Sequence, residues 1–258
     1  MSSKYQLFAQ YPSLVSVLSI LKSAQYSSLP EVEELLNIYS KISDDSKKIE
    51  SGDNRKHPLI VLEGLDGCGK SHTSKLVAQK LKASLKSTPP PSIVALREKF
   101  DSQDGVLRRA YYSLGNYIAA HDIRQILHKQ PVVMDRFWHS TAAYGMANTI
   151  ISNSDLKLPD PDDELYNWPE DLLKPDLIIY LTVSEQIRLQ RLSRRKTFTE
   201  EEAELKKNAK FREIINNIFR NMKNPEIVVV DNSEKNVHES SDDIVKMAKE
   251  LPSYKHST

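Results

Sequence analysis

The chain has 258 residues, a formal net charge of +1, ordinary apolar content and one cysteine. This length is enough for one large α/β domain with an appendage. The balanced charge argues against a general nucleic-acid binder, which normally carries a basic excess. A single cysteine excludes an internal disulfide framework and fits a reducing compartment. No apolar run approaches the length of a membrane span.

Residues 1–57 are predicted to form a separate helical appendage. Apolar residues within 14–21 recur at helical spacing, and a second helix is expected to begin at Pro30. Residues 41–56 are polar and charged, which predicts a linker. The first part of this segment is rich in serine and has no acidic residue, as in transit peptides, but it also lacks arginine. It therefore leaves targeting undecided.

The most informative stretch of the chain is residues 58–71. An aliphatic run ending at Glu63 predicts a strand, and G-x-x-x-x-G-K-S follows it directly, with a helical pattern behind. In such a loop, backbone N–H groups and the helix N-terminus point at phosphate oxygens. Lys70 is expected to contact the β- and γ-phosphates of ATP, and Ser71 to bind Mg²⁺. The predicted ATP-binding residues are Gly64, Leu65, Asp66, Gly67, Cys68, Gly69, Lys70 and Ser71.

Strand and helix patterns alternate from this loop onward. The helix behind the loop is expected to include Leu85, and a long helix is predicted from about residue 106 to 129. Because the predicted strands are almost uniformly apolar, they should be buried on both faces of a parallel sheet covered by helices. Ligands should collect at the carboxyl ends of these strands. The further predicted strands are residues 92–96, 131–135, 177–182 and 227–231.

Asp135 and Arg136 close the third predicted strand. An aspartate near Ser71 can order Mg²⁺ and its waters. An arginine there can hold an acceptor phosphate by two parallel N–H bonds, which a lysine cannot do. The alternative is an incidental surface pair in a loop.

Arginines also gather after the fourth predicted strand. A helix expected behind Ser184 carries Arg188, Arg191, Arg194 and Arg195 on one side, and a second helix is expected to begin at Thr199. Two helices joined by an arginine-rich hinge describe a lid that brings guanidinium groups onto a transferring phosphoryl. The alternative is a solvated basic helix end.

Residues 64–71 together with residues 135–140 (D-R-F-W-H-S) resemble the thymidylate kinase family. The longer runs 108–117 and 168–177 resemble its mitochondrial UMP–CMP kinase branch, and the likeness runs from about residue 58 to 250. It implies a three-layer P-loop kinase fold with a five-stranded parallel sheet and a helical lid. Residues 58–258 would form a nucleoside monophosphate kinase domain. The implied reaction moves the γ-phosphoryl of ATP, with Mg²⁺, to UMP, CMP, dUMP, dCMP or dTMP.

The resemblance also implies roles for single residues. Some family members have arginine where this chain has Gly67, so the transition-state cation is expected from the lid. Asn116-Tyr117 stands where the family often has Asn-Arg, which leaves the base preference open. The implied acceptor-binding residues are Asp66, Arg97, Arg136 and either Tyr111 or Tyr112, which would stack on the base. The implied catalytic residues are Lys70, Asp135, Arg136, Arg191, Arg194 and Arg195.

Other classes of protein share part of this sequence pattern. A regulatory GTPase should carry an N-K-x-D motif, which the chain lacks, and its only D-x-x-G lies inside the phosphate loop. A kinase for another small molecule and a non-catalytic nucleotide-binding protein stay as alternatives. The expected partners are ATP and a nucleoside monophosphate, without nucleic acid or membrane. The resemblance suggests a homodimer and a mitochondrial location, but the arginine-free N-terminus weakens the second, so mitochondria and cytoplasm both stay open.

Overall fold

A five-stranded sheet lies at the centre of the computed structural model, which describes residues 3–46, 55–193 and 208–255. Its strand order is β2-β3-β1-β4-β5, and all neighbouring strands are parallel. This confirms the predicted sheet. The strands are β1 (Leu59–Glu63), β2 (Ser84–Ser87), β3 (Val132–Asp135), β4 (Leu177–Thr182) and β5 (Ile227–Asp231).

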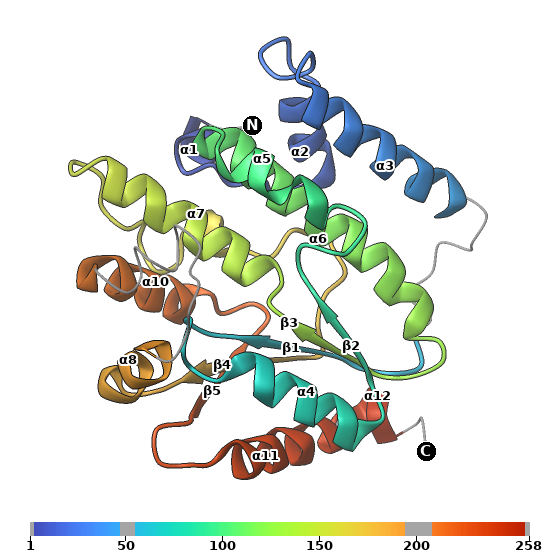
Figure 1. Cartoon of the computed structure of the whole chain (residues 1–258), viewed down its shortest axis with the longest axis vertical. Coiled ribbons are helices and arrows are strands. Elements are labelled where there is room, and N and C mark those ends of the chain that lie inside the picture. Colours follow the sequence, from blue (N-terminus) through green and yellow to red (C-terminus); the bar gives the residue numbers. More distant parts are fainter. Residues whose placement is uncertain (1–2, 47–54, 194–207, 256–258) are drawn as a thin grey trace.

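Helices cover both faces of this sheet, which gives the predicted three layers (Figure 1). Leu59 and Val61 point to the face covered by α6, α7 and α10, while Ile60 and Leu62 point to the face covered by α4 and α11. These covering helices are α4 (Lys70–Leu81), α6 (Gly105–Ile126), α7 (Trp138–Ser152), α10 (Ala209–Asn221) and α11 (Val237–Glu250). Shorter elements are η1 (Val94–Leu96), α5 (Arg97–Asp101), η2 (Glu164–Tyr166), α8 (Glu185–Ser193) and α12 (Pro252–Lys255).

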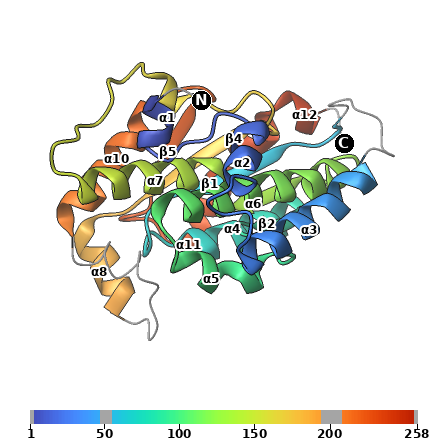
Figure 2. The same cartoon turned by 90° about the horizontal axis from the view of Figure 1, so that it is seen from above.

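The N-terminal helices α2 (Leu14–Leu21) and α3 (Pro30–Ser46) pack on the outer side of α6 (Figures 1 and 2). Tyr5 of the short helix α1 (Ser3–Leu7) packs against the apolar cluster that contains α7, and its hydroxyl donates to the backbone oxygen of Glu164. A linker was predicted for residues 41–56, and this prediction is wrong for residues 41–46, which belong to α3. Ile42 packs against the apolar cluster under α3 and so prolongs the helix. Residues 47–54 lie outside the described part. The boundary at residue 57 stays a prediction.

The second strand differs from its prediction. β2 is formed by residues 84–87, whereas residues 94–96 form the short helix η1. α4 ends at Leu81 because Lys82 adopts a positive φ of 52°, so Leu85 belongs to β2 and not to the helix. β2 pairs with β3 alone, at the edge of the sheet, where polar residues are tolerated. Apolar residues of the predicted strand, Ile93 and Leu96, instead fill the cluster beneath α2.

The predicted lid is described only in part. α8 begins at Glu185, as expected, and α10 buries the predicted apolar residues Phe211, Ile215 and Ile218. Arg194, Arg195 and the helix start at Thr199 lie outside the described residues. No helix within the described ranges is long and apolar enough to cross a membrane.

Candidate active site

The phosphate loop joins the end of β1 to the first turn of α4, as predicted. Gly64 and Gly69 adopt φ values of 151° and 97°, which side chains rarely permit. A Cβ at Gly64 would lie 2.5 Å from the backbone oxygen of Leu181, and one at Gly69 would lie 3.0 Å from Nδ2 of Asn232. The loop conformation therefore requires glycine at both positions.

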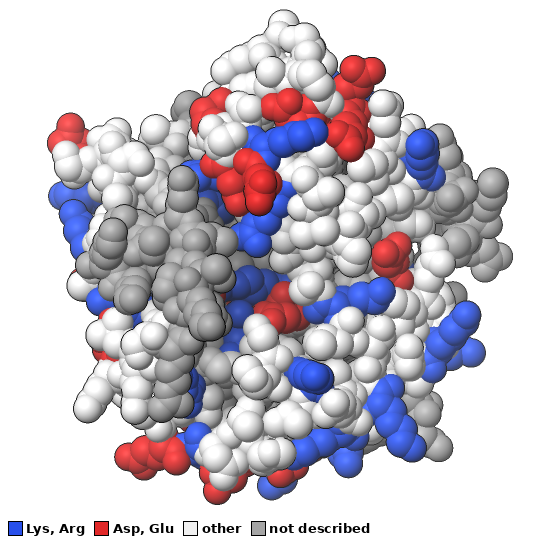
Figure 3. Space-filling model, viewed as in Figure 1, with Lys and Arg blue, Asp and Glu red and all other residues white. Residues whose placement is uncertain are grey.

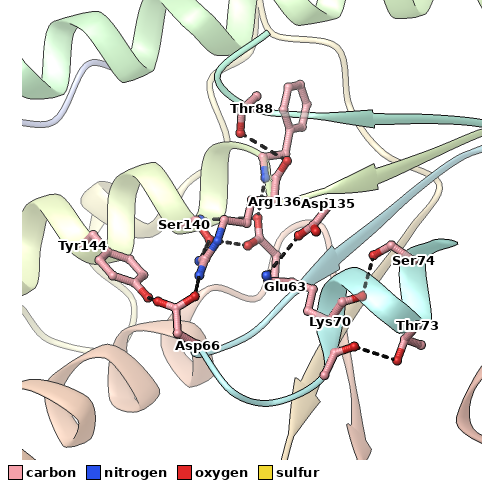
Figure 4. Close-up of polar contacts among 12 residues, drawn as sticks. Glu63, Asp66, Lys70, Thr73, Ser74, Thr88, Asp135, Arg136, Ser140 and Tyr144 are labelled. Carbon is pink, nitrogen blue, oxygen red and sulfur yellow. Dashed lines mark hydrogen bonds and ion pairs between the residues drawn. The ribbon is translucent and has the colours of Figure 1, made fainter. Parts of the chain in front are cut away.

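Lys70 lies beside the end of the neighbouring strand. Its Nζ is 3.0 Å from Oδ1 of Asp135 (Figure 4). Burial raises the pKa of Asp135, but the Lys70 charge and a hydrogen bond with Ser71 outweigh it, so the pKa is lowered from its ordinary value. Asp135 is thus an ionised carboxylate at the mouth of the phosphate loop.

The donor set at this point suits Mg²⁺. Ser71 and Asp135 offer hydroxyl and carboxylate oxygens, which this ion prefers, and both line the same cavity. Mg²⁺ is usually held by one or two protein groups, with water and phosphate oxygens completing its shell. The described residues hold no cluster of three or more acidic, His or Cys side chains that could hold a metal ion.

Arg136 connects the phosphate loop to the other side of the cavity. Its Nη2 donates to Oδ1 of Asp66 at 2.7 Å, and its Nη1 donates to Oγ of Ser140 at 3.0 Å. The hydroxyl of Tyr144 donates to Oδ2 of Asp66 at 3.4 Å. Burial would lower the pKa of Arg136, but Asp66 and the other acidic neighbours raise it well above its ordinary value. The guanidinium is therefore a fixed positive charge.

Glu63, the last residue of β1, was not predicted to belong to the site. Its carboxylate accepts hydrogen bonds from the backbone N–H groups of Phe137 at 2.8 Å and Ser140 at 3.3 Å, and from the Ser140 hydroxyl. Burial raises the pKa of Glu63 even though these bonds favour the charged form. The carboxylate holds the start of α7 and so fixes Ser140 beside Arg136. A charged residue ending an otherwise apolar strand is the sequence signal that could have found it.

A cavity of about 320 Å³ lies beside the phosphate loop. Figure 3 shows Lys and Arg side chains gathered with acidic ones near the middle of this face of the molecule. The residues that line the cavity are Asp66, Lys70, Ser71, Ser87, Thr88, Pro89, Arg97, Arg109, Tyr112, Asp135, Arg136, Ser140, Thr141 and Tyr144. The structure thus brings together the predicted residues of the loop, the strand end and the acceptor side. Arg109, Thr141 and Tyr144 had no predicted role.

The two predicted tyrosines differ in position. Tyr112 lines the cavity, and its hydroxyl accepts a hydrogen bond from Nε of Arg97 at 3.1 Å. Tyr111 is fully buried, stacks on Phe100 and donates its hydroxyl to the backbone oxygen of Ile93. The prediction of a base-stacking role is therefore corrected for Tyr111, because its ring completes the apolar cluster under α6.

Arg191 contacts the phosphate loop from outside the cavity. Its Nη1 donates to the backbone oxygen of Cys68 at 2.9 Å, and its Nη2 donates to that of Asn232 at 3.4 Å. The neighbouring Arg188 donates to the backbone oxygen of Asp66 at 3.2 Å. Among the described residues, the lid arginines thus bind loop carbonyls. A transition-state role of Arg191 stays a prediction, as does any role of Arg194 and Arg195.

A parallel sheet with a glycine-rich phosphate loop at the carboxyl end of one of its strands defines a P-loop nucleotide-binding protein. The family model described as "Thymidylate kinase" matches residues 62–244. The chain therefore belongs to the thymidylate kinase family, which confirms the resemblance noted in the sequence.

Individual relatives agree with this assignment. The chain is 42% identical to the human mitochondrial UMP-CMP kinase 2 over 208 residues, which are 80% of this chain and 45% of that protein. It therefore spans less than half the length of this relative. It is 27% identical over 198 residues to a probable thymidylate kinase of Methanococcus maripaludis, covering 72% of this chain and 92% of the relative. The thymidylate kinase structure from Candida albicans matches with a TM-score of 0.58 and 22% identity, over 79% of this chain and 94% of that one, which supports the fold.

Proposed function

We propose that the chain is an ATP-dependent kinase that transfers the γ-phosphoryl of ATP to a pyrimidine (deoxy)nucleoside monophosphate. The observation that carries this proposal is the bond between Asp66 and Arg136. Both residues line the cavity beside the phosphate loop, which Arg97 also lines, so that a donor and an acceptor phosphate can meet there. The relatives named for UMP, CMP and thymidylate support an acceptor among UMP, CMP, dUMP, dCMP and dTMP.

The donor side consists of the loop residues 64–71. Their backbone N–H groups would bind the phosphates of ATP, and Lys70 would contact the β- and γ-phosphates. Ser71 and Asp135 would hold Mg²⁺, which when bound neutralises negative charge on the phosphates.

On the acceptor side, Arg97 and Arg136 would hold the acceptor phosphate, and Tyr112 would contact the nucleoside. This phosphate is already a charged nucleophile, so positioning and charge neutralisation are sufficient and no covalent intermediate is needed. Lys70 and the lid arginines Arg191, Arg194 and Arg195 are the proposed sources of positive charge for the transferring group.

The test is a panel of nucleoside monophosphates with purified protein, Mg²⁺ and ATP, with release of ADP as the readout. We expect turnover with at least one pyrimidine monophosphate and slower turnover with AMP and GMP. A protein that turns over none of the five pyrimidine acceptors would refute the proposal.

We further infer a homodimer from the family resemblance, which light scattering on the purified protein would test. For the compartment, the name of the human relative supports mitochondria. The cytoplasm is the competing hypothesis. Imaging of the chain carrying a C-terminal fluorescent tag separates the two.

A further inference from the structure

Arg109 of α6 lines the cavity, although the sequence predicted no role for it in the site. The residue is only 3% exposed, and its guanidinium lies over the ring of Tyr112, with Cζ 5.6 Å from the ring centroid. A guanidinium only donates hydrogen bonds, so a ligand group that it binds must offer an acceptor oxygen or nitrogen. The cavity therefore presents a planar donor group on the side formed by α6.

Gly145 of α7 makes room for the side chain of Arg109. A Cβ at Gly145 would lie 3.2 Å from Cδ and 3.4 Å from Cγ of Arg109. It would also lie 2.9 Å from Nε2 of Gln10, a residue of the N-terminal segment. The stem of Arg109 and the amide of Gln10 thus meet at the same point of the α7 surface.

Gln10 is held firmly at that point. It is 5% exposed, and its Nε2 donates to the backbone oxygens of Ala142 at 3.2 Å and Phe8 at 3.1 Å. The next residue, Tyr11, donates its hydroxyl to the backbone oxygen of Val106 at 2.7 Å, one turn before Arg109 on α6. Residues 8–11 are therefore attached to both helices that carry this side of the cavity.

We propose that Arg109 binds the acceptor nucleotide through an acceptor atom of its sugar or base, and that Gln10 is a positioning residue for Arg109. The inference rests on the proposed function. The acceptor phosphate itself is assigned to Arg97 and Arg136, so Arg109 is left for the nucleoside. Residues 8–11 then form the back of the acceptor site, and the N-terminal helices are part of the kinase and not only an appendage.

The first test compares two glycine variants of the full-length protein. Gly145→Ala should raise KM for the acceptor roughly fivefold, because its methyl group displaces Arg109 or Gln10, while kcat and KM for ATP change by less than about twofold. Gly105→Ala is the matched control, since a Cβ there meets no atom within 4 Å. Thermal unfolding of both variants shows whether the fold is kept.

The second test removes the side chains themselves. Arg109→Ala should raise KM for the acceptor about 10- to 100-fold, the range for losing a hydrogen bond to a charged group. Gln10→Ala should raise it by less, and Gln6→Ala, at an exposed position of α1, should leave it unchanged. The double variant of Gln10→Ala and Gly145→Ala should have a smaller effect than the two single effects multiplied, because the new methyl group occupies the space of the lost amide.

The acceptors UMP, dUMP and CMP identify the atom that is bound. If Arg109→Ala no longer raises KM when dUMP is the acceptor, the ribose 2′-hydroxyl is the partner of Arg109. If the rise in KM differs between UMP and CMP, the partner is an atom of the base. Suppose that the wild-type enzyme is active and that Gly145→Ala and Gln10→Ala have the same KM for the acceptor as their control variants. This result overturns the inference and leaves the proposed function intact. A wild-type enzyme without turnover refutes the function instead. In that case, unaltered calorimetric binding of nucleoside monophosphates to Arg109→Ala also refutes the inference.

Discussion

Nη1 of Arg191, on α8, donates a hydrogen bond of 2.9 Å to the backbone oxygen of Cys68 in the phosphate loop. The side chain of Asn232, just after β5, donates to the same oxygen at 3.0 Å. Asn232 is itself held by the hydroxyl of Ser240 at 2.8 Å. Two segments far apart in the sequence thus fix one peptide of the loop, on the side away from the cavity.

Arg191→Ala should therefore weaken ATP binding. We expect KM for ATP to rise about tenfold, the effect of losing a charge-assisted hydrogen bond, with a smaller change in kcat. Gln190→Ala, exposed on the same helix, is the control. Asn232→Ala should be coupled to Arg191→Ala in a double-mutant cycle, because both side chains bind the same oxygen. A lower kcat with unaltered affinity for ATP would instead assign Arg191 to the transition state.

Lys70→Ala should nearly abolish turnover. Lys70 is the ammonium group that lies between the phosphate loop and Asp135, and its loss should lower kcat by at least about a hundredfold. Circular dichroism should show an intact fold. Lys75→Ala, exposed on the same helix α4, should keep full activity. Near-normal turnover by Lys70→Ala would mean that the loop is not the donor site.

Glu63→Ala should destabilise the protein. The substitution leaves the buried donors of Phe137 and Ser140 without their acceptor, which costs about 1–3 kcal/mol per unsatisfied group in the free energy of unfolding. Glu63→Gln keeps an acceptor oxygen for the backbone bonds and should cost less. Urea unfolding measures the difference, and equal stability of the two variants would contradict the assigned role of the carboxylate.

His139 makes stability depend on pH. Burial lowers its pKa from the ordinary value of 6.5 to about 3. Between pH 3 and pH 6.5, the imidazole is therefore protonated in the unfolded chain and neutral in the folded protein. Its contribution is complete above pH 6.5 and is lost as the pH falls toward 3. It accounts for about 2 kcal/mol of the stability lost between pH 7 and pH 5.

His139→Phe tests this contribution. The Nδ1 atom of His139 makes no hydrogen bond within the described structure, and the ring packs against those of Trp138 and Trp168, so an aromatic replacement keeps these contacts. The variant should lose less stability than the wild type when urea unfolding is compared at the two pH values. An identical pH dependence would assign the loss to other groups.

The parts of the site that depend on short-range spacing could be predicted from the sequence. The phosphate loop is formed by consecutive residues, and β1 and β3 end side by side because Leu62 pairs with Asp135 in the parallel register. The meeting of Lys70, Asp135 and Arg136 follows from those two facts. The strands β4 and β5 were found because they are apolar.

What could not be predicted depends on side-chain directions between distant segments. Nothing in the sequence indicates that Gln10 and Arg109 meet over Gly145, or that Glu63 reaches Ser140. The edge strand β2 was missed because its polar residues carry no apolar signal. Tyr111 and Tyr112 are adjacent in the sequence, and only the packing of α6 on Phe100 decides which ring enters the core.

The apolar cluster around α6 has a consequence for where the protein can be cut. Val17, Leu21 and Leu35 lie before residue 57, and they share this cluster with Leu107 and Tyr111 of α6. A fragment that begins at the phosphate-loop strand would keep every motif but expose this apolar surface to water. The segment needed for folding is therefore longer than the segment that carries the motifs. A shortened enzyme should aggregate even though it retains all of its nucleotide-binding residues.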